Sequence, residues 1–209
     1  MRRSTVVNLR RVKFAEFICK NHILFLLTFA LVAGIVAGTA TVVRLENIQS
    51  ITKSLLVKFV DVREDKPFMY VLFNSFLSSL LYTVAVFVSG ASMLGVVVVP
   101  FVVLVRGFAY GGLLSYLYMT YALKGIAFNA IIVIPPAIIF LIGLLFAARE
   151  AVGFSLKIAR LSLPHSSPSS LYVDFKMYCG RFAFYCAIIL ISAITDAVLC
   201  CSFMGFFKL

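Results

Sequence analysis

Charged residues are scarce in this chain. Of its 209 residues 13% are charged and 63% are hydrophobic, and the mean hydropathy is +1.08. A soluble domain of this length has too little interior to bury so much apolar surface. The composition therefore excludes an ordinary soluble domain, and the expected fold class is an all-α, polytopic integral membrane protein.

Residues that carry catalysis or bind metals are also few. The two histidines, His22 and His165, have no ligand residues beside them, and the five cysteines form no C-x-x-C pair. The motifs H-E-x-x-H and G-x-x-x-x-G-K-[ST] are absent. Serines next to glycine, such as Ser89, have no histidine at membrane depth to activate them. We therefore expect no enzyme activity, no catalytic residue, no metal site and no cofactor.

Acidic residues are outnumbered, with 8 Asp and Glu against 19 Lys and Arg, for a net charge of +11. Such a charge can indicate nucleic-acid binding, but the basic residues here collect in the N-terminal arm and in one late loop. The positive-inside rule and anionic head groups account for both positions. The expected partners therefore include membrane lipids and exclude nucleic acid.

Five apolar segments predict membrane spans, each of which needs about 20 helical residues. They lie at about 22–43, 74–92, 95–121, 127–148 and 179–203 of a single membrane domain, 1–209. The outer loop 44–73 has apolar residues at helical spacing, which predicts an amphipathic helix on the membrane surface or against a partner. A second surface helix is expected over 149–161, within a basic cytoplasmic loop at 149–178.

The basic residues also orient the spans. Six of them precede the first span, which predicts a cell-membrane protein with a cytoplasmic N-terminus: Arg2, Arg3, Arg10, Arg11, Lys13 and Lys20. The late loop is basic as well, so an even number of spans must separate it from the N-terminus. Four do so if 95–121 crosses once, and the C-terminus is then outside.

Two charges, Arg106 and Asp196, lie deep inside predicted spans. An arginine at a helix centre costs roughly 2.5–3.5 kcal/mol, so Arg106 should not face lipid. Arg106 lies roughly 16 Å along its helix from Gly95, and Asp196 lies roughly 22 Å from Arg181, the last basic residue before its span. The small difference predicts an Arg106–Asp196 pair, and a proton or ion relay is the alternative.

Small residues and prolines mark where helices meet or break. Gly34 and Gly38 in the first span, and Gly107 and Gly111 in the third, are spaced by four, which predicts close helix packing. A proline pair beginning at Pro135 must kink or break the fourth span. Interrupted spans are also typical of transporters.

Several motifs stand in a fixed order along the chain. Asn74 opens the second span, and SGASMLGVVVVPFVVLVRGFAYGG, KGIAF and IIVIPP follow it. Lys20-Asn21-His22 precedes the first span, and Asp196 lies in the last. This order is similar to that of the stage II sporulation protein M family of bacterial and archaeal membrane proteins. The resemblance covers most of the chain and is clearest over 73–153, and the family more often has Glu where Asp196 stands.

This resemblance implies a non-enzymatic five-span protein. The founding member works with sporulation proteins D and P, which degrade peptidoglycan during engulfment, and holds them at the septal membrane of the forespore. Many relatives occur in organisms that never sporulate. We therefore expect a membrane scaffold or assembly factor whose partners are other membrane or cell-wall proteins, including peptidoglycan hydrolases in a sporulation member. Homo-oligomerisation stays open.

The residues expected to matter are structural or interaction sites. They are Asn74, Arg106, Gly107, Gly111, Pro135 and Asp196. The alternative function is a permease or a membrane subunit of a transport system. A transporter needs a polar, water-accessible cavity around Arg106 and Asp196, whereas a scaffold can be packed dry there.

Overall fold

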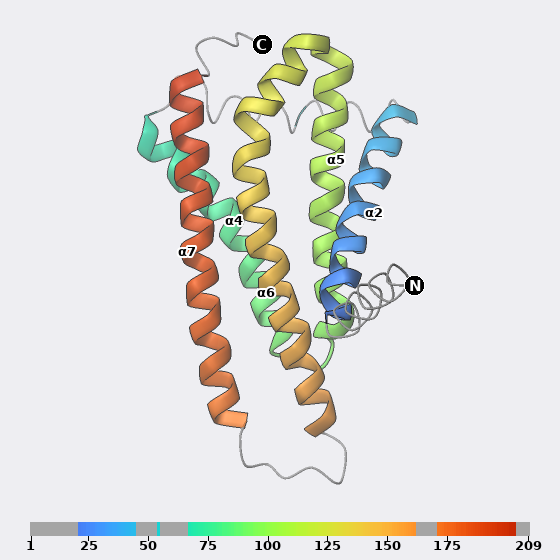
Figure 1. The fold of residues 1–209 in the computed structure, drawn as a ribbon, viewed down its shortest axis with the longest axis vertical. Coiled ribbons are helices and arrows are strands. Elements are labelled where there is room, and N and C mark those ends of the chain that lie inside the picture. Colours follow the sequence, from blue (N-terminus) through green and yellow to red (C-terminus); the bar gives the residue numbers. More distant parts are fainter. Residues whose placement is uncertain (1–20, 45–53, 55–66, 162–170, 204–209) are drawn as a thin grey trace, which may run out of the picture.

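Every described element of the protein is helical. A computed structural model describes residues 21–44, 54, 67–161 and 171–203 (Figure 1). The elements are α2 (His22–Arg44), α4 (Phe68–Gly90), α5 (Gly95–Phe128), the π-helix η1 (Asn129–Val133), α6 (Ile134–Leu161) and α7 (Leu171–Phe203). The expected all-α class is confirmed.

Four helical runs in the described part are long and apolar enough to cross a membrane, and one of them, Gly95–Arg160, is 66 residues long. That run doubles back on itself, with α5 and α6 side by side and antiparallel (Figure 1). Near one end Ser155 of α6 donates a hydrogen bond to the carbonyl oxygen of Ser92 at 2.7 Å. With 34 residues in α5 and 28 in α6, each arm exceeds the roughly 20 residues of a span. The protein is therefore a polytopic membrane protein, and its described part contains five membrane-length helices.

The reversal between these arms occurs at Ala122. Its φ of 44° and ψ of −123° are non-helical, and it is the one described residue other than glycine with a positive φ. At Gly125 an added Cβ would overlap the carbonyl oxygen of Leu117, so a glycine is needed where the chain folds back. Beyond this reversal the chain resumes helical geometry at once, through Phe128 and into η1.

Helices α2 and α5 pack in parallel along their glycines. A Cβ at Gly34 or Gly38 would overlap a backbone carbonyl oxygen of α5, and one at Gly107 or Gly111 would meet a carbonyl oxygen of α2. The contacts advance in the same direction on both helices, which makes the pair parallel (Figure 1). The close packing predicted from the four-residue spacing is confirmed, and each glycine pair faces the other.

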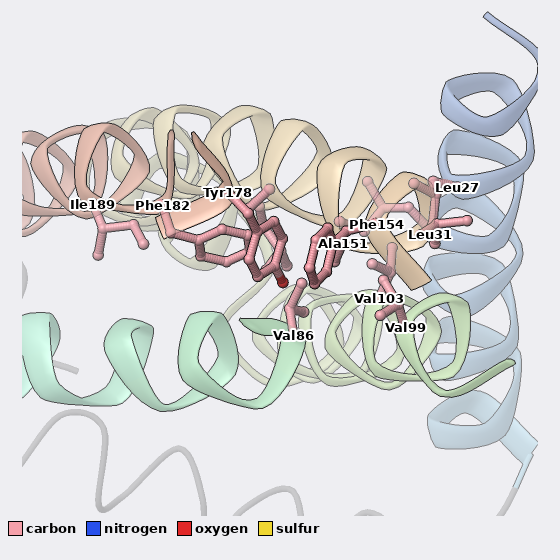
Figure 2. Close-up of a cluster of buried hydrophobic side chains, with 14 of the residues drawn as sticks. Leu27, Leu31, Val86, Val99, Val103, Ala151, Phe154, Tyr178, Phe182 and Ile189 are labelled. Carbon is pink, nitrogen blue, oxygen red and sulfur yellow. The ribbon is translucent and has the colours of Figure 1, made fainter. Parts of the chain in front are cut away.

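The main core joins all five membrane-length helices. Leu27 and Leu31 from α2 and Val99 and Val103 from α5 lie at one side of it. Figure 2 shows the core continuing from there to the rings at the α6–α7 contact. The apolar stripes of the spans therefore meet inside the protein, while their other faces stay exposed, as a lipid-facing surface requires.

Aromatic stacking holds α4, α6 and α7 together. The Tyr178 ring of α7 stacks on Phe154 of α6 at 4.5 Å and on Phe87 of α4 at 5.1 Å between centroids. Its hydroxyl donates a hydrogen bond to the Phe87 carbonyl oxygen at 3.0 Å. A Cβ at Gly90 would overlap this hydroxyl and Ala151, so a glycine is needed for α4 to approach so closely.

Several predicted boundaries differ from the observed ones. Helix α4 begins at Phe68, because the apolar residues just after Pro67 already belong to the span. The surface helix predicted over 149–161 is wrong: these residues continue α6, and Ala151 and Phe154 are buried in the main core. Helix α7 likewise begins at Leu171, within the predicted loop. The basic N-terminal arm (1–20) and most of the predicted outer amphipathic segment (45–53 and 55–66) lie outside the described residues.

Candidate functional site

The Arg106 guanidinium lies inside a cage of three aromatic rings. Its Cζ is 4.3 Å from the ring centroid of Tyr82 on α4, 4.6 Å from Tyr110 on α5 and 4.9 Å from Phe140 on α6. Nη2 also donates a hydrogen bond to the Tyr110 hydroxyl at 3.2 Å, and Nε is buried without a hydrogen-bond partner. Three different helices therefore position this one charge.

Aromatic rings can hold a cation without a carboxylate. The negative face of each ring attracts the guanidinium, and this attraction grows when the cation is desolvated. Arginine suits such a site because its planar group stacks on rings and is more weakly hydrated than an ammonium. Tyr82 of α4 and Phe140 of α6 lie against Arg106, whose side chain is half-buried, and its avoidance of lipid stays a prediction.

Asp196 lies at a separate polar contact between α4 and α7. Its side chain is buried, with 6% of its surface exposed. The Ser75 hydroxyl of α4 donates to Oδ2, and Cys200 Sγ, one turn further along α7, lies 3.8 Å from Oδ1. A buried carboxylate needs such donors, because leaving it without them costs more than a lost hydrogen bond between neutral groups.

The predicted Arg106–Asp196 pair is not formed. Among the described helices, Lys157 pairs with Asp174 and Arg181 with Glu150, both at one end of α6 and α7. On α4 the partners of the two charges, Tyr82 and Ser75, are seven residues apart, which separates the two levels by about 10 Å along the helix.

The prediction failed because it counted depth on α7 from Arg181. The start of α5 follows Gly90, and Gly90 lies level with Tyr178. Counted from Tyr178, Asp196 is about 27 Å along α7, against about 16 Å for Arg106 along α5. The difference is too large for a direct pair.

Gly107 and Gly111 belong to the α2–α5 contact and not to either charged site. Thr39 of α2 adds a polar contact there, donating from Oγ1 to the Gly111 carbonyl oxygen at 3.3 Å and to the Ile35 carbonyl oxygen at 3.0 Å. A hydroxyl that donates to carbonyl oxygens of both helices stabilises their close contact. The two glycines are therefore packing residues.

Pro135 lies at the beginning of α6, directly after η1. Because prolines 135 and 136 lack amide donors, the α-helical ladder cannot continue unbroken through them. The expected interruption is confirmed, and it takes the form of a π-helix. Ser192 of α7 donates to the Pro136 carbonyl oxygen at 2.8 Å, which fixes α7 against this region.

Asn129 is a residue that sequence reasoning missed. It is fully buried in η1, its Nδ2 donates to the Tyr118 hydroxyl at 2.7 Å, and its Oδ1 has no hydrogen-bond partner. A polar residue within an apolar run beside a proline pair was the available signal. Asn74, which was predicted, is only half-buried, and its neighbour Ser75 makes the contact with α7.

One site is built on the half-buried Arg106 and the other on the buried Asp196, both within the helical bundle. Among the described residues no three His, Cys, Asp or Glu side chains are grouped so as to hold a metal ion. The fold and these sites define an all-α, multi-pass membrane protein. Comparisons with protein-family models, with curated proteins and with solved structures find no match for this chain.

Proposed function

We propose that this protein is a non-enzymatic scaffold of the cell membrane that holds other membrane or cell-wall proteins in place. The order of its motifs supports this, since it is similar to that of the stage II sporulation protein M family. In that family the partners degrade peptidoglycan, so peptidoglycan hydrolases are the partner class to test. A septal or forespore location belongs to the proposal only if the source organism sporulates.

The enclosure of both interior charges carries the proposal. Arg106 has three aromatic rings within 4.9 Å of its Cζ, and Asp196 is 6% exposed with a serine hydroxyl on its carboxylate. A transporter exposes its intramembrane charges to a water-filled path in at least one state. The aromatic contacts of the half-buried Arg106 and the burial of Asp196 favour a packing role for these charges.

The proposed orientation has the N-terminus in the cytoplasm and the C-terminus outside. Six basic residues before α2 support the cytoplasmic N-terminus. Five membrane-length helices then carry the chain to the opposite side. In this orientation the segment 45–66 faces outward, toward the cell wall, and is the proposed partner-binding segment.

Crosslinking in native membranes, followed by affinity purification, tests the proposal. One variant has residues 45–66 scrambled, which leaves α2 and α4 intact because they end at Arg44 and begin at Phe68. The matched control has residues 162–170 scrambled, between α6 and α7 on the opposite side. We expect peptidoglycan-degrading enzymes with wild type and control, and their loss with the 45–66 variant.

The opposite result is equally specific. If no protein co-purifies with wild type, while proteoliposomes show solute flux that Arg106→Gln abolishes, the scaffold proposal is wrong. The permease alternative then replaces it.

A further inference from the structure

The ends of α6 and α7 that lie away from the Ala122 reversal enclose a groove of about 150 Å³. Its walls include Glu150, Gly153 and Lys157 from α6 and Asp174, Tyr178 and Arg181 from α7. The apolar run of α6 ends at Ala148, just before Arg149 and Glu150, so the groove lies where membrane spans give way to charged segments. This is the depth of lipid head groups.

Two ion pairs bracket the groove. Lys157 Nζ lies 3.2 Å from Asp174 Oδ1, and Arg181 pairs with Glu150. The pairs are seven residues apart on both helices, or about 10 Å. The side chains of Lys157 and Arg181 are 58% and 57% exposed, against 21% and 27% for Asp174 and Glu150. The cations therefore form the rim, and the carboxylates lie deeper.

The groove is open because residue 153 has no side chain. A Cβ added at Gly153 would meet nothing within 4 Å. The wall beside it is rigid, since the Tyr178 ring is stacked on Phe154 and its hydroxyl is bonded to the Phe87 carbonyl oxygen. The space lies at the α6–α7 contact and is smaller than the roughly 300–1,000 Å³ of drug-sized pockets.

We propose that this groove binds the head group of a zwitterionic phospholipid that carries a primary amine. Arg181, on the side of the apolar span, holds the phosphate together with Lys157. The ammonium donates a hydrogen bond to Asp174, which lies about 10 Å along the helices from Glu150 and further from the span. The site is independent of the scaffold function proposed above.

The net charge of the groove and the small cost of opening its ion pairs support this ligand class. Among the side chains that line the groove, two carboxylates and two cations sum to zero, which matches a neutral zwitterion inside it better than an anionic head group. Exposed ion pairs add little stability, so a ligand that replaces both partners opens them at small cost. A primary ammonium has N–H donors for the carboxylates, whereas a quaternary ammonium has none.

Native mass spectrometry of the delipidated full chain tests the proposal, with phosphatidylethanolamine, phosphatidylcholine and phosphatidylglycerol titrated separately. We expect phosphatidylethanolamine to bind about tenfold more tightly than either other lipid, the scale of one hydrogen bond to a charged group. Equal binding of phosphatidylcholine or phosphatidylglycerol overturns the assignment. O-phosphorylethanolamine carries the same phosphate and primary amine without acyl chains, so it distinguishes a lipid from a soluble ligand. If it binds as tightly as phosphatidylethanolamine, the assignment to a lipid is also overturned.

Two glycines provide a matched pair of variants. Gly153→Leu fills the groove, while Gly180→Leu adds the same side chain where a Cβ also meets nothing within 4 Å but outside the groove. We expect Gly153→Leu to lose phosphatidylethanolamine binding and Gly180→Leu to keep it. The double variant Glu150→Gln, Arg181→Gln keeps polar side chains at both positions and removes one ion pair, and we expect it to lose binding too. Retained binding in Gly153→Leu or in the double variant contradicts the proposal.

Discussion

Thr39 on α2 donates a hydrogen bond to the carbonyl oxygen of Gly111 on α5 at 3.3 Å, across a parallel helix pair. This contact is possible because Gly34 and Gly38 on one helix and Gly107 and Gly111 on the other leave room for backbone to meet backbone. In a membrane, where lipid is as apolar as leucine, such packing supplies much of the association between helices. The α2–α5 pair is therefore held by shape more than by burial of large side chains.

Enlarging Gly111 tests that conclusion. Gly111→Leu places a side chain against the Ile35 backbone of α2, and overpacking of this kind costs typically about 1–3 kcal/mol of unfolding free energy. Denaturant unfolding in detergent, followed by circular dichroism, measures the loss. Gly180→Leu is the control, because a Cβ there meets nothing within 4 Å. Equal midpoints for both variants would show that the α2–α5 contact does not limit stability.

A double-mutant cycle distinguishes the aromatic cage from the pair first predicted. Arg106→Leu combined with Tyr82→Leu should show a coupling of about 0.5–2 kcal/mol, the range for cation–π contacts. Arg106→Leu combined with Asp196→Asn should be additive within about 0.5 kcal/mol, as for separated sites. The same unfolding measurement serves both cycles. Coupling to Asp196 without coupling to Tyr82 would contradict the cage.

Removing the hydroxyl of Ser75 should weaken the α4–α7 contact. Ser75→Ala takes a donor from the buried Asp196 carboxylate, which costs about 1–3 kcal/mol of unfolding free energy. Ser78, one turn away on α4 and exposed, is the control, and Ser78→Ala should change stability by less than about 0.5 kcal/mol. Thermal unfolding of the two purified variants checks the difference. A neutral Ser75→Ala would show that this bond carries no net stability.

Replacing Ala122 by glycine should make the protein more stable. Its φ of 44° is costly for an alanine and ordinary for glycine, so Ala122→Gly should raise the unfolding free energy by about 1 kcal/mol. Ala109 is exposed in the regular part of α5, and Ala109→Gly should lower stability by about the same amount. Opposite shifts in melting temperature confirm the strained reversal. Shifts of the same sign contradict it.

The sequence alone predicted the local features of the chain. Apolar runs set the number and class of the helices, because a bilayer demands about 20 apolar residues in a span. The glycine spacing in α2 and α5 predicted close packing, and the proline pair at Pro135 predicted an interrupted helix. Even the cage had one visible element, since Tyr110 follows Arg106 by one helical turn and forms its hydrogen bond.

The partners of the buried charges depended on how the helices lie against one another. Depth along one helix says nothing about register with the next, and the level of α7 was set by Tyr178 at Gly90, not by its last basic residue. Residues 149–161 looked like a surface helix because charges interrupt them, yet α7 extends far enough to bury Ala151 and Phe154. Composition and period thus defined the helices of this protein, whereas the side chain that faces each charge followed from register, a property of helix pairs that no single segment contains.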